Sequence, residues 1–422
     1  MPMEREGLPG EVVQPGAAIA PHLPLAVGND ATATSPDGAA PSLHRYYAYK
    51  LMSAVDLAGG IWILYLRHRG LSLTEIGLAE SCFHLAPITL ELPTGSLADI
   101  LGRKWSLAIG SLLVAISALL LLAAHSLWLV LPAMYLNGAS YAFRSGADQA
   151  FLYDALAERA GTDPFARILG RLLSVSYLVI AASTWLGATL AGRDFTWPYV
   201  LTAAIGLAGA YLASGLREPV RDRAAHRGLL RTIAEALRII RGQPGLAALL
   251  GFAAGLWTLL TLIGLYAQAV LADQGLATSR IGLVIGSSLL CTATGSWFAH
   301  RLTARGGFPA WTIAVTAAIV AGGLGLGSGV LALGVAAYLL AELAAGLYEP
   351  LLSTRVNDGV AAAQRATILS VEGFLFSATM IWAFPLTGWV ADHGGWLLAY
   401  AAAGSVVVLL LLGWLALDRA RT

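Results

Sequence analysis

Six carboxylates lie inside long apolar stretches of this sequence, where ionisable side chains are rare. They are Asp56, Glu80, Glu91, Glu342, Glu349 and Glu372. A carboxylate buried away from any cation takes up a proton, so it can be charged in one state of a protein and neutral in another. We expect few buried cations here, because Lys and Arg concentrate at the ends of the stretches. The pattern predicts proton binding or attraction of a cationic ligand, first at Asp56 and Glu342, which lie deepest. A hydrogen-bonded structural acid is the alternative for any single one of them.

Aromatic and small polar residues in the same stretches could line a central cavity. These candidates are Tyr47, His84, Asn137, Trp257, Tyr266, Gln268, Tyr338 and Trp382. For each one, packing between helices or a place at the membrane interface is the more common role. His84 could also titrate near neutral pH.

Motifs for soluble enzyme chemistry are missing from the sequence. We find no Walker loop, no His/Cys metal cluster and no nucleophile elbow in its strand–turn–helix context. Cys82 and Cys291 both lie in apolar runs, which predicts neither a disulfide framework nor a metal site. The net charge of +1 gives no sign of a nucleic-acid partner. We expect no cofactor, with a proton gradient as the driving force.

The elements that position these residues must be membrane helices. The chain is 57% hydrophobic and 12% charged, against about 45–50% and about 25% in soluble proteins. A helix needs about 20 apolar residues to cross the hydrocarbon of a bilayer. Twelve stretches qualify: 44–66, 74–98, 104–124, 127–149, 167–191, 196–216, 246–271, 279–301, 309–328, 331–353, 367–391 and 395–417. The sequence predicts an all-α, multi-pass membrane protein surrounded by lipid.

The distribution of basic residues predicts the orientation. If the N-terminal tail is cytoplasmic, cytoplasmic segments hold about 22 of the 26 Lys and Arg, and the outer loops hold only Arg67, Arg69, Arg193 and Arg280. Both termini are therefore expected inside the cell. The predicted organisation is a disordered tail (1–43), a six-helix bundle (44–216), a cytoplasmic linker with an amphipathic helix (217–245), a second six-helix bundle (246–417) and a short tail (418–422).

A short pattern recurs at the end of the second span in each group of three. It reads "GSLAD" at 95–99, "GATLA" at 187–191, "GSWFA" at 295–299 and "GWVAD" at 388–392. Because successive spans alternate in direction, neighbouring groups of three are inverted. Nested inverted repeats are typical of secondary transporters, whose substrate site lies between the halves.

The first copy continues as "GSLADILGRK", between the second and third spans. With the twelve spans and the basic central loop, it resembles the major facilitator superfamily, whose loop signature is G-x-L-A-D-x-x-G-R-K. The resemblance implies alternating-access transport of a small molecule, with this loop as a cytoplasmic gate. The implied gate residues are Gly95, for close helix approach, with Asp99, Gly102, Arg103 and Lys104. We expect Arg144, at the inner end of span 4, as a partner within the same half. Glu91 lies one turn from this loop, which predicts a link between protonation and opening.

Acids in spans 1 and 10 are similar to those of the proton-driven drug exporters of that family. The sequence departs from that branch in two places: span 5 reads "ASTWLGATLAG" without the usual Gly-Pro element, and the middle of span 4 has no arginine. The first prediction is proton-coupled export of small amphipathic or cationic compounds by a monomer in the cell membrane. The alternatives are proton-coupled uptake of a metabolite, a membrane-embedded transferase, and a transport-dead sensor or scaffold, which the intact gate motif disfavours.

Overall fold

The structure is a computed structural model that describes residues 43–160, 165–219, 238, 242–303, 307–358 and 365–419. Every regular element in these ranges is a helix. The predicted disordered tail and nearly all of the predicted amphipathic linker helix lie outside the described residues.

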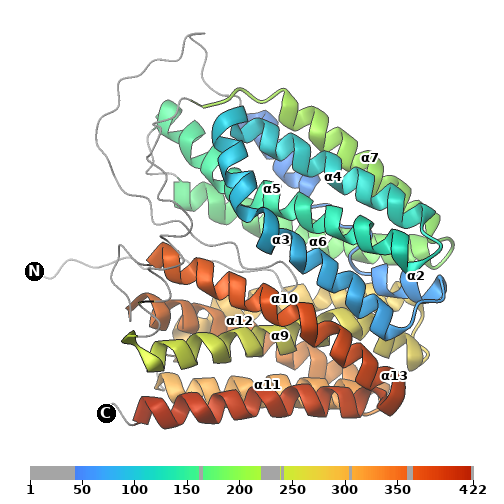
Figure 1. The fold of residues 1–422 in the computed structure, drawn as a ribbon, viewed down its shortest axis with the longest axis vertical. Coiled ribbons are helices and arrows are strands. Elements are labelled where there is room, and N and C mark those ends of the chain that lie inside the picture. The colour runs from blue at the N-terminus through green and yellow to red at the C-terminus, as the bar shows by residue number, and fades with distance from the viewer. Residues whose placement is uncertain are drawn as a thin grey trace, which may run out of the picture.

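The helices pack as two groups (Figure 1). The first group contains α1 (Leu43–Ser53), α2 (Trp62–His68), α3 (Leu73–Leu101), α4 (Arg103–Ala123), α5 (Leu127–Ala160), α6 (Phe165–Ala191) and α7 (Thr196–Ser214). The second group contains α9 (Pro244–Asp273), α10 (Thr278–Thr303), α11 (Phe308–Gly327), α12 (Leu331–Asp358) and α13 (Arg365–Arg419). We call the side where α3, α5 and α13 end the terminal side. The opposite side, where α3 and α5 begin, is the far side.

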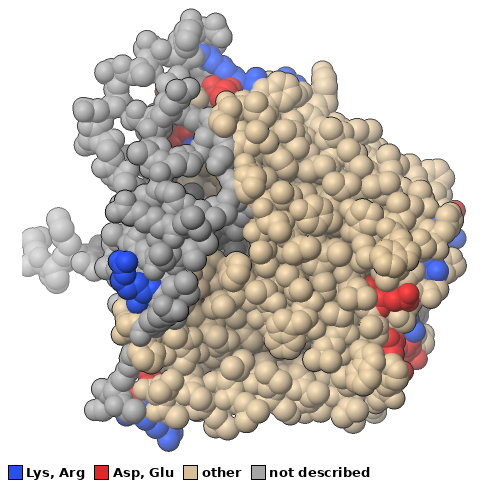
Figure 2. Space-filling view, viewed as in Figure 1, with Lys and Arg blue, Asp and Glu red and all other residues tan. Residues whose placement is uncertain are grey.

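The surface has the character of a membrane protein. Of the described helices, 8 are long and apolar enough to cross a membrane. In the view of Figure 2, charged side chains gather toward the two ends of the molecule, and an uncharged belt separates them. The chain is therefore a multi-pass membrane protein. Twelve crossings and cytoplasmic termini stay predictions.

The first predicted span is broken. The expected continuous helix over 44–66 is wrong, because α1 ends at Ser53 and α2 begins only at Trp62. Two consecutive glycines, Gly59 and Gly60, lie in the interruption, and glycine weakens a helix. The carboxylate of Asp56 also accepts a hydrogen bond from the backbone N–H of Gly59 at 2.7 Å, which competes with helical pairing.

Three other helix boundaries can be compared with the predicted spans. The expected split between spans 9 and 10 is confirmed, since α11 ends at Gly327 and α12 begins at Leu331. Spans 11 and 12 are joined in α13, which kinks at Gly395 with φ 79°. α5 continues to Ala160, well past the predicted end at 149. Arg144 therefore lies near the middle of its helix and not at its inner end. The expected lack of an arginine in the middle of this helix is wrong.

The two groups meet along α3 with α13, α6 with α10, and α2 with α9. One core of buried apolar residues runs across this interface, from Ile61 and Ile76 to Tyr266 and Phe384. In Figure 1, α3 and the first half of α13 lie together at the far side and separate toward the terminal side.

Candidate functional site

The break in the first span is held by side chains from both groups. The backbone N–H of Asp56 donates to the Ser183 hydroxyl at 2.9 Å. From the second group, the Gln268 side-chain amide donates to the Gly59 carbonyl at 2.8 Å and accepts from the Ile63 N–H at 3.1 Å. Gln268 thus replaces helical hydrogen bonds that the break removes. Interrupted membrane helices with backbone groups satisfied in this way are typical of transporter binding sites.

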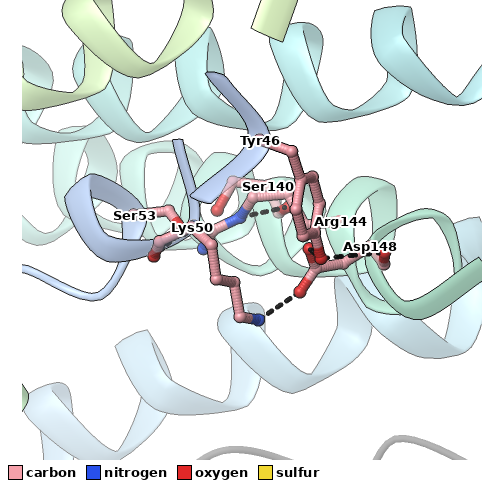
Figure 3. A network of polar contacts seen from close by, with 6 residues as sticks. All are labelled: Tyr46, Lys50, Ser53, Ser140, Arg144 and Asp148. Atoms are coloured by element: carbon pink, nitrogen blue, oxygen red, sulfur yellow. Dashed lines mark hydrogen bonds and ion pairs between the residues drawn. The ribbon is translucent and has the colours of Figure 1, made fainter. Parts of the chain in front are cut away.

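A polar network lies beside this break in the first group (Figure 3). Lys50 of α1 forms an ion pair with Asp148 of α5, and their side chains are only 18% and 16% exposed. The Tyr46 hydroxyl donates to Asp148 at 2.8 Å. Arg144 donates through Nε to the Ser140 carbonyl at 3.3 Å, and its charge also acts on Asp56.

The sequence prediction missed part of this network. Few buried cations were expected, yet Lys50, in the last turn of α1, and Arg144 are both half-buried. Lys50 lies inside the predicted span 44–66, so the sequence alone could have indicated a buried cation at this position. From the sequence, Asp148 is expected to be merely interfacial, because the predicted span ends at 149, whereas α5 continues to Ala160.

In the second group, Glu342 is 0% exposed between α10, α12 and α9. One carboxylate oxygen accepts from the Thr292 hydroxyl at 2.9 Å. The other forms no close hydrogen bond with a described residue, although the Tyr338 hydroxyl interacts with the carboxylate. No cation among the described residues acts on it. Glu372 is also buried, and it interacts with the indole of Trp257.

The structure brings together two residues that the sequence assigned to separate sets. The carboxylate of Glu80 lies 3.4 Å from Nε2 of His84. Both side chains are buried, at 5% and 1% exposed.

The predicted gate loop is built mainly from contacts within the first group. Gly102, with φ 108°, separates α3 from α4. Glu218 accepts from the backbone N–H groups of Arg103 at 2.6 Å and Lys104 at 3.0 Å, which caps α4. Arg103 forms an ion pair with Asp154 of α5. The sequence prediction missed Glu218 and Asp154, which lie far from the motif along the chain.

The close helix approach predicted at Gly95 is not formed among the described residues. Gly95 is exposed, and no described residue lies within 4 Å of the position that a Cβ would take, so the expected close helix approach is absent. The side chains of Asp99 and Glu91 lie outside the described residues. The pairing of Arg144 with Asp99 therefore stays a prediction.

The far side is closed by the fourth copy of the repeat. The carboxylate of Asp392 accepts from the backbone N–H groups of Leu73 at 3.1 Å and Thr74 at 2.9 Å. The Tyr266 hydroxyl lies 3.2 Å from the Leu73 carbonyl and 3.0 Å from that of Phe384. An ion pair between Arg67 and Asp273, 2.6 Å long, adds to this closure.

The other predicted lining residues are scattered. Tyr338 is buried and donates to Ser288 at 3.0 Å, so it packs inside the second group. Asn137, Trp257 and Glu349 are partly buried, and Trp382 is 53% exposed. For these side chains a place at the substrate site stays a prediction.

Comparisons with known proteins agree with this architecture. No curated protein sequence matched the chain. Among solved structures, a mutant of the nucleoside transporter NupG has a TM-score of 0.77 at 15% identity, covering 89% of this chain and 99% of that one. A bacterial homologue of the human lysosomal transporter Spinster, inward-facing and unoccupied, has a TM-score of 0.67 at 15% identity, covering 89% and 95%. A D-xylose-proton symporter has a TM-score of 0.60 at 16% identity, covering 88% and 96%.

At these identities the structural likeness concerns the fold. The sequence itself matches the family model of the Major Facilitator Superfamily over residues 51–377 of 422. The chain belongs to the Major Facilitator Superfamily, a family of membrane transporters and not of enzymes.

Proposed function

We propose that this protein is a proton-coupled secondary transporter that moves a small polar organic solute by alternating access. The observation that carries the proposal is Glu342, a fully buried carboxylate that interacts with the hydroxyls of Thr292 and Tyr338 and with no cation among the described residues. Such a group is most stable when protonated, and a change in its surroundings would release the proton. A proton gradient would then drive the cycle without a cofactor.

The polar network of the first group supports a polar solute. Lys50, Arg144 and Asp148 place half-buried charges beside the broken span that holds Asp56. The terminal guanidinium nitrogens of Arg144 make no hydrogen bond to the described residues, so their donors are available to a solute. Hydroxyl-rich or amide-rich solutes offer the acceptors that such donors require.

Uptake is the direction we favour. Two similar structures are a nucleoside transporter and a D-xylose-proton symporter, and this chain lacks the Gly-Pro element expected of drug antiporters. Export of small amphipathic or cationic compounds is the second candidate, because the acids Asp56 and Glu342 occupy the spans that carry acids in the exporters.

The test uses purified protein in liposomes that contain a pH-sensitive dye. Nucleosides, pentoses and cationic dyes are added in turn, and the internal pH is followed. We expect one solute class to move protons, and Glu342→Gln to reduce that movement at least about tenfold, since an amide cannot carry the proton. Proton movement at the wild-type rate in Glu342→Gln would overturn the assignment of this residue.

Asp194→Asn is the matched control. Asp194 lies in the exposed turn between α6 and α7, where hydrogen bonds from Thr196 lower its pKa. The carboxylate is therefore charged throughout the assay, and its replacement leaves proton movement unchanged. Accumulation of the active solute in expressing and empty cells, with and without an uncoupler, then separates uptake from export.

A further inference from the structure

The Glu80–His84 pair lies on the seam between the two helix groups. Gly77, Ser81 and His84 share one face of α3 by helical spacing, and Glu80 lies among them. Gly77 packs against the backbone of Pro385, and the Ser81 hydroxyl donates to the Ile381 carbonyl at 2.5 Å. The His84 ring meets the ring of Phe376 edge-on, with centroids 5.5 Å apart. All three partners belong to α13, so this face of α3 is covered only while the two groups are together.

The pair itself is poorly satisfied. Neither ring nitrogen of His84 has a hydrogen-bond partner among the described residues, although the residue is only 1% exposed. Buried polar atoms in native proteins are nearly always paired, and exceptions frequently mark a functional group. A carboxylate oxygen of Glu80 lies 3.4 Å from Nε2. A carboxyl and an imidazole at this separation can share one proton, in either the neutral or the ionic form.

Among the described residues, the ionisable groups around the pair are mainly acids and tyrosines. On α13, the nearest ionisable groups are the acids Glu372, one turn from Phe376, and Asp392, at the far end of the seam. On α9, Tyr266 interacts electrostatically with Glu80. Behind Phe83, α5 contacts α3 through Gly138. The ionisable groups nearest to Gly138 along the chain are Tyr135 and Tyr141, followed by Arg144. No Lys or Arg among the described residues forms an ion pair with Glu80.

We propose that Glu80 and His84 form a proton-binding site that is loaded from the far side, and that the seam closes only when the pair holds one proton. With that proton the pair has no net charge, and α13 can cover it. Without the proton a lone carboxylate would be buried against Phe376, which is strongly unfavourable. Opening the far side exposes the pair to water and allows exchange. This inference rests on the proposed proton coupling and assigns one of its binding sites.

The test measures closure of the far side directly. Spin labels are placed on Trp128 of the first group and Val330 of the second, both exposed at the far side, in a Cys82→Ser, Cys291→Ser background. In lipid nanodiscs we expect the ratio of closed to open molecules to fall about tenfold per pH unit above the midpoint, as linkage to one proton requires. In Glu80→Gln the pair is neutral without a bound proton, so above the wild-type midpoint the closed fraction stays high and changes less than about twofold.

Two further variants complete the test. Glu75→Gln lies on the same helix and preserves the capping interaction with Ser72, because glutamine serves at this position as well. It retains the wild-type pH dependence. In His84→Leu the proton is held by Glu80 alone, and closure shifts to lower pH. Wild-type pH dependence in both Glu80→Gln and His84→Leu, or no pH dependence in the wild type, overturns the proposal.

The liposome assay separates this inference from the proposed function. If the wild type moves no protons with any solute, the proposed function fails. If the wild type moves protons and Glu80→Gln moves as many protons per solute, only the assignment of the pair fails.

Discussion

Gln268 contributes both ends of its amide to the break in the first span. Its partners are the carbonyl of Gly59 and the N–H of Ile63, which belong to the other helix group. The side chain is 1% exposed, so no water replaces these bonds while the groups are together. A single residue thereby makes the backbone of one group depend on the position of the other.

Replacement of Gln268 by leucine leaves two buried backbone groups without partners. Each such group costs about 1–3 kcal/mol, so Gln268→Leu should shift molecules away from the far-side-closed state. The distance between labels at 128 and 330 measures the shift. Gln274→Leu is the control, because Gln274 lies just past the same helix and bonds to Leu326 within its own group. Equal effects of the two variants on this distance would show that Gln268 does not link the groups.

Gly59 also leaves room in the break for the side chain of Asp56. A Cβ at this position would collide with the carboxylate of Asp56, so Gly59→Ala should displace that side chain. We expect at least about a tenfold loss of solute transport, since misplacement of a functional group by about 1 Å can cost up to about 100-fold. Gly251→Ala is the control, since no described atom lies within 4 Å of its Cβ position. Transport by Gly59→Ala at the rate of Gly251→Ala would argue against a role for Asp56.

At the scale of the helix, α3 is capped twice at its far-side end. Ser72 and Glu75 form a capping box within the first group, and Asp392 reaches the same turn from α13. A carboxylate at a helix N-terminus satisfies free N–H groups and interacts favourably with the helix dipole. The first cap belongs to the helix in every state, whereas the second exists only when the far side is closed.

Removing each cap should therefore have different consequences. Asp392→Ala and Ser72→Ala each remove a cap worth about 0.5–2 kcal/mol. Ser72→Ala should lower the melting temperature without changing the far-side label distance. Asp392→Ala should increase the population with a long distance. An unchanged distance distribution in Asp392→Ala would show that this contact does not hold the far side closed.

At the scale of the whole molecule, the repeat was the most informative feature of the sequence. The prediction placed "GWVAD" in register with "GSLAD". In the structure the former closes the far side through Asp392, while Gly95 of the latter has no close neighbour among the described residues. The two copies thus lie on opposite sides of the molecule. One contacts the other helix group and the other has no close neighbour among the described residues, as expected for inverted repeats in one state of an alternating cycle.

Composition and helical length predicted the fold class, because lipid imposes both. The break at Asp56 could not be predicted from hydropathy, since residues 54–61 are nearly as apolar as a helix, and the groups that stabilise the break come from Ser183 and Gln268. The Glu80–His84 pair follows from helical spacing, yet its position on the seam depends on how α3 packs against α13. The buried Lys50–Asp148 pair required knowing that α5 extends to Ala160.

Alternating access is tested most directly by measuring both sides of the molecule in the same sample conditions. Labels at Trp128 and Val330 report the far side, and labels at Ala157 and Thr354, both exposed, report the terminal side. Across pH and with the active solute, we predict that one distance lengthens whenever the other shortens, with low pH favouring the short far-side distance. Distances that lengthen together, or a terminal-side distance that never changes, would contradict alternating access by these two helix groups.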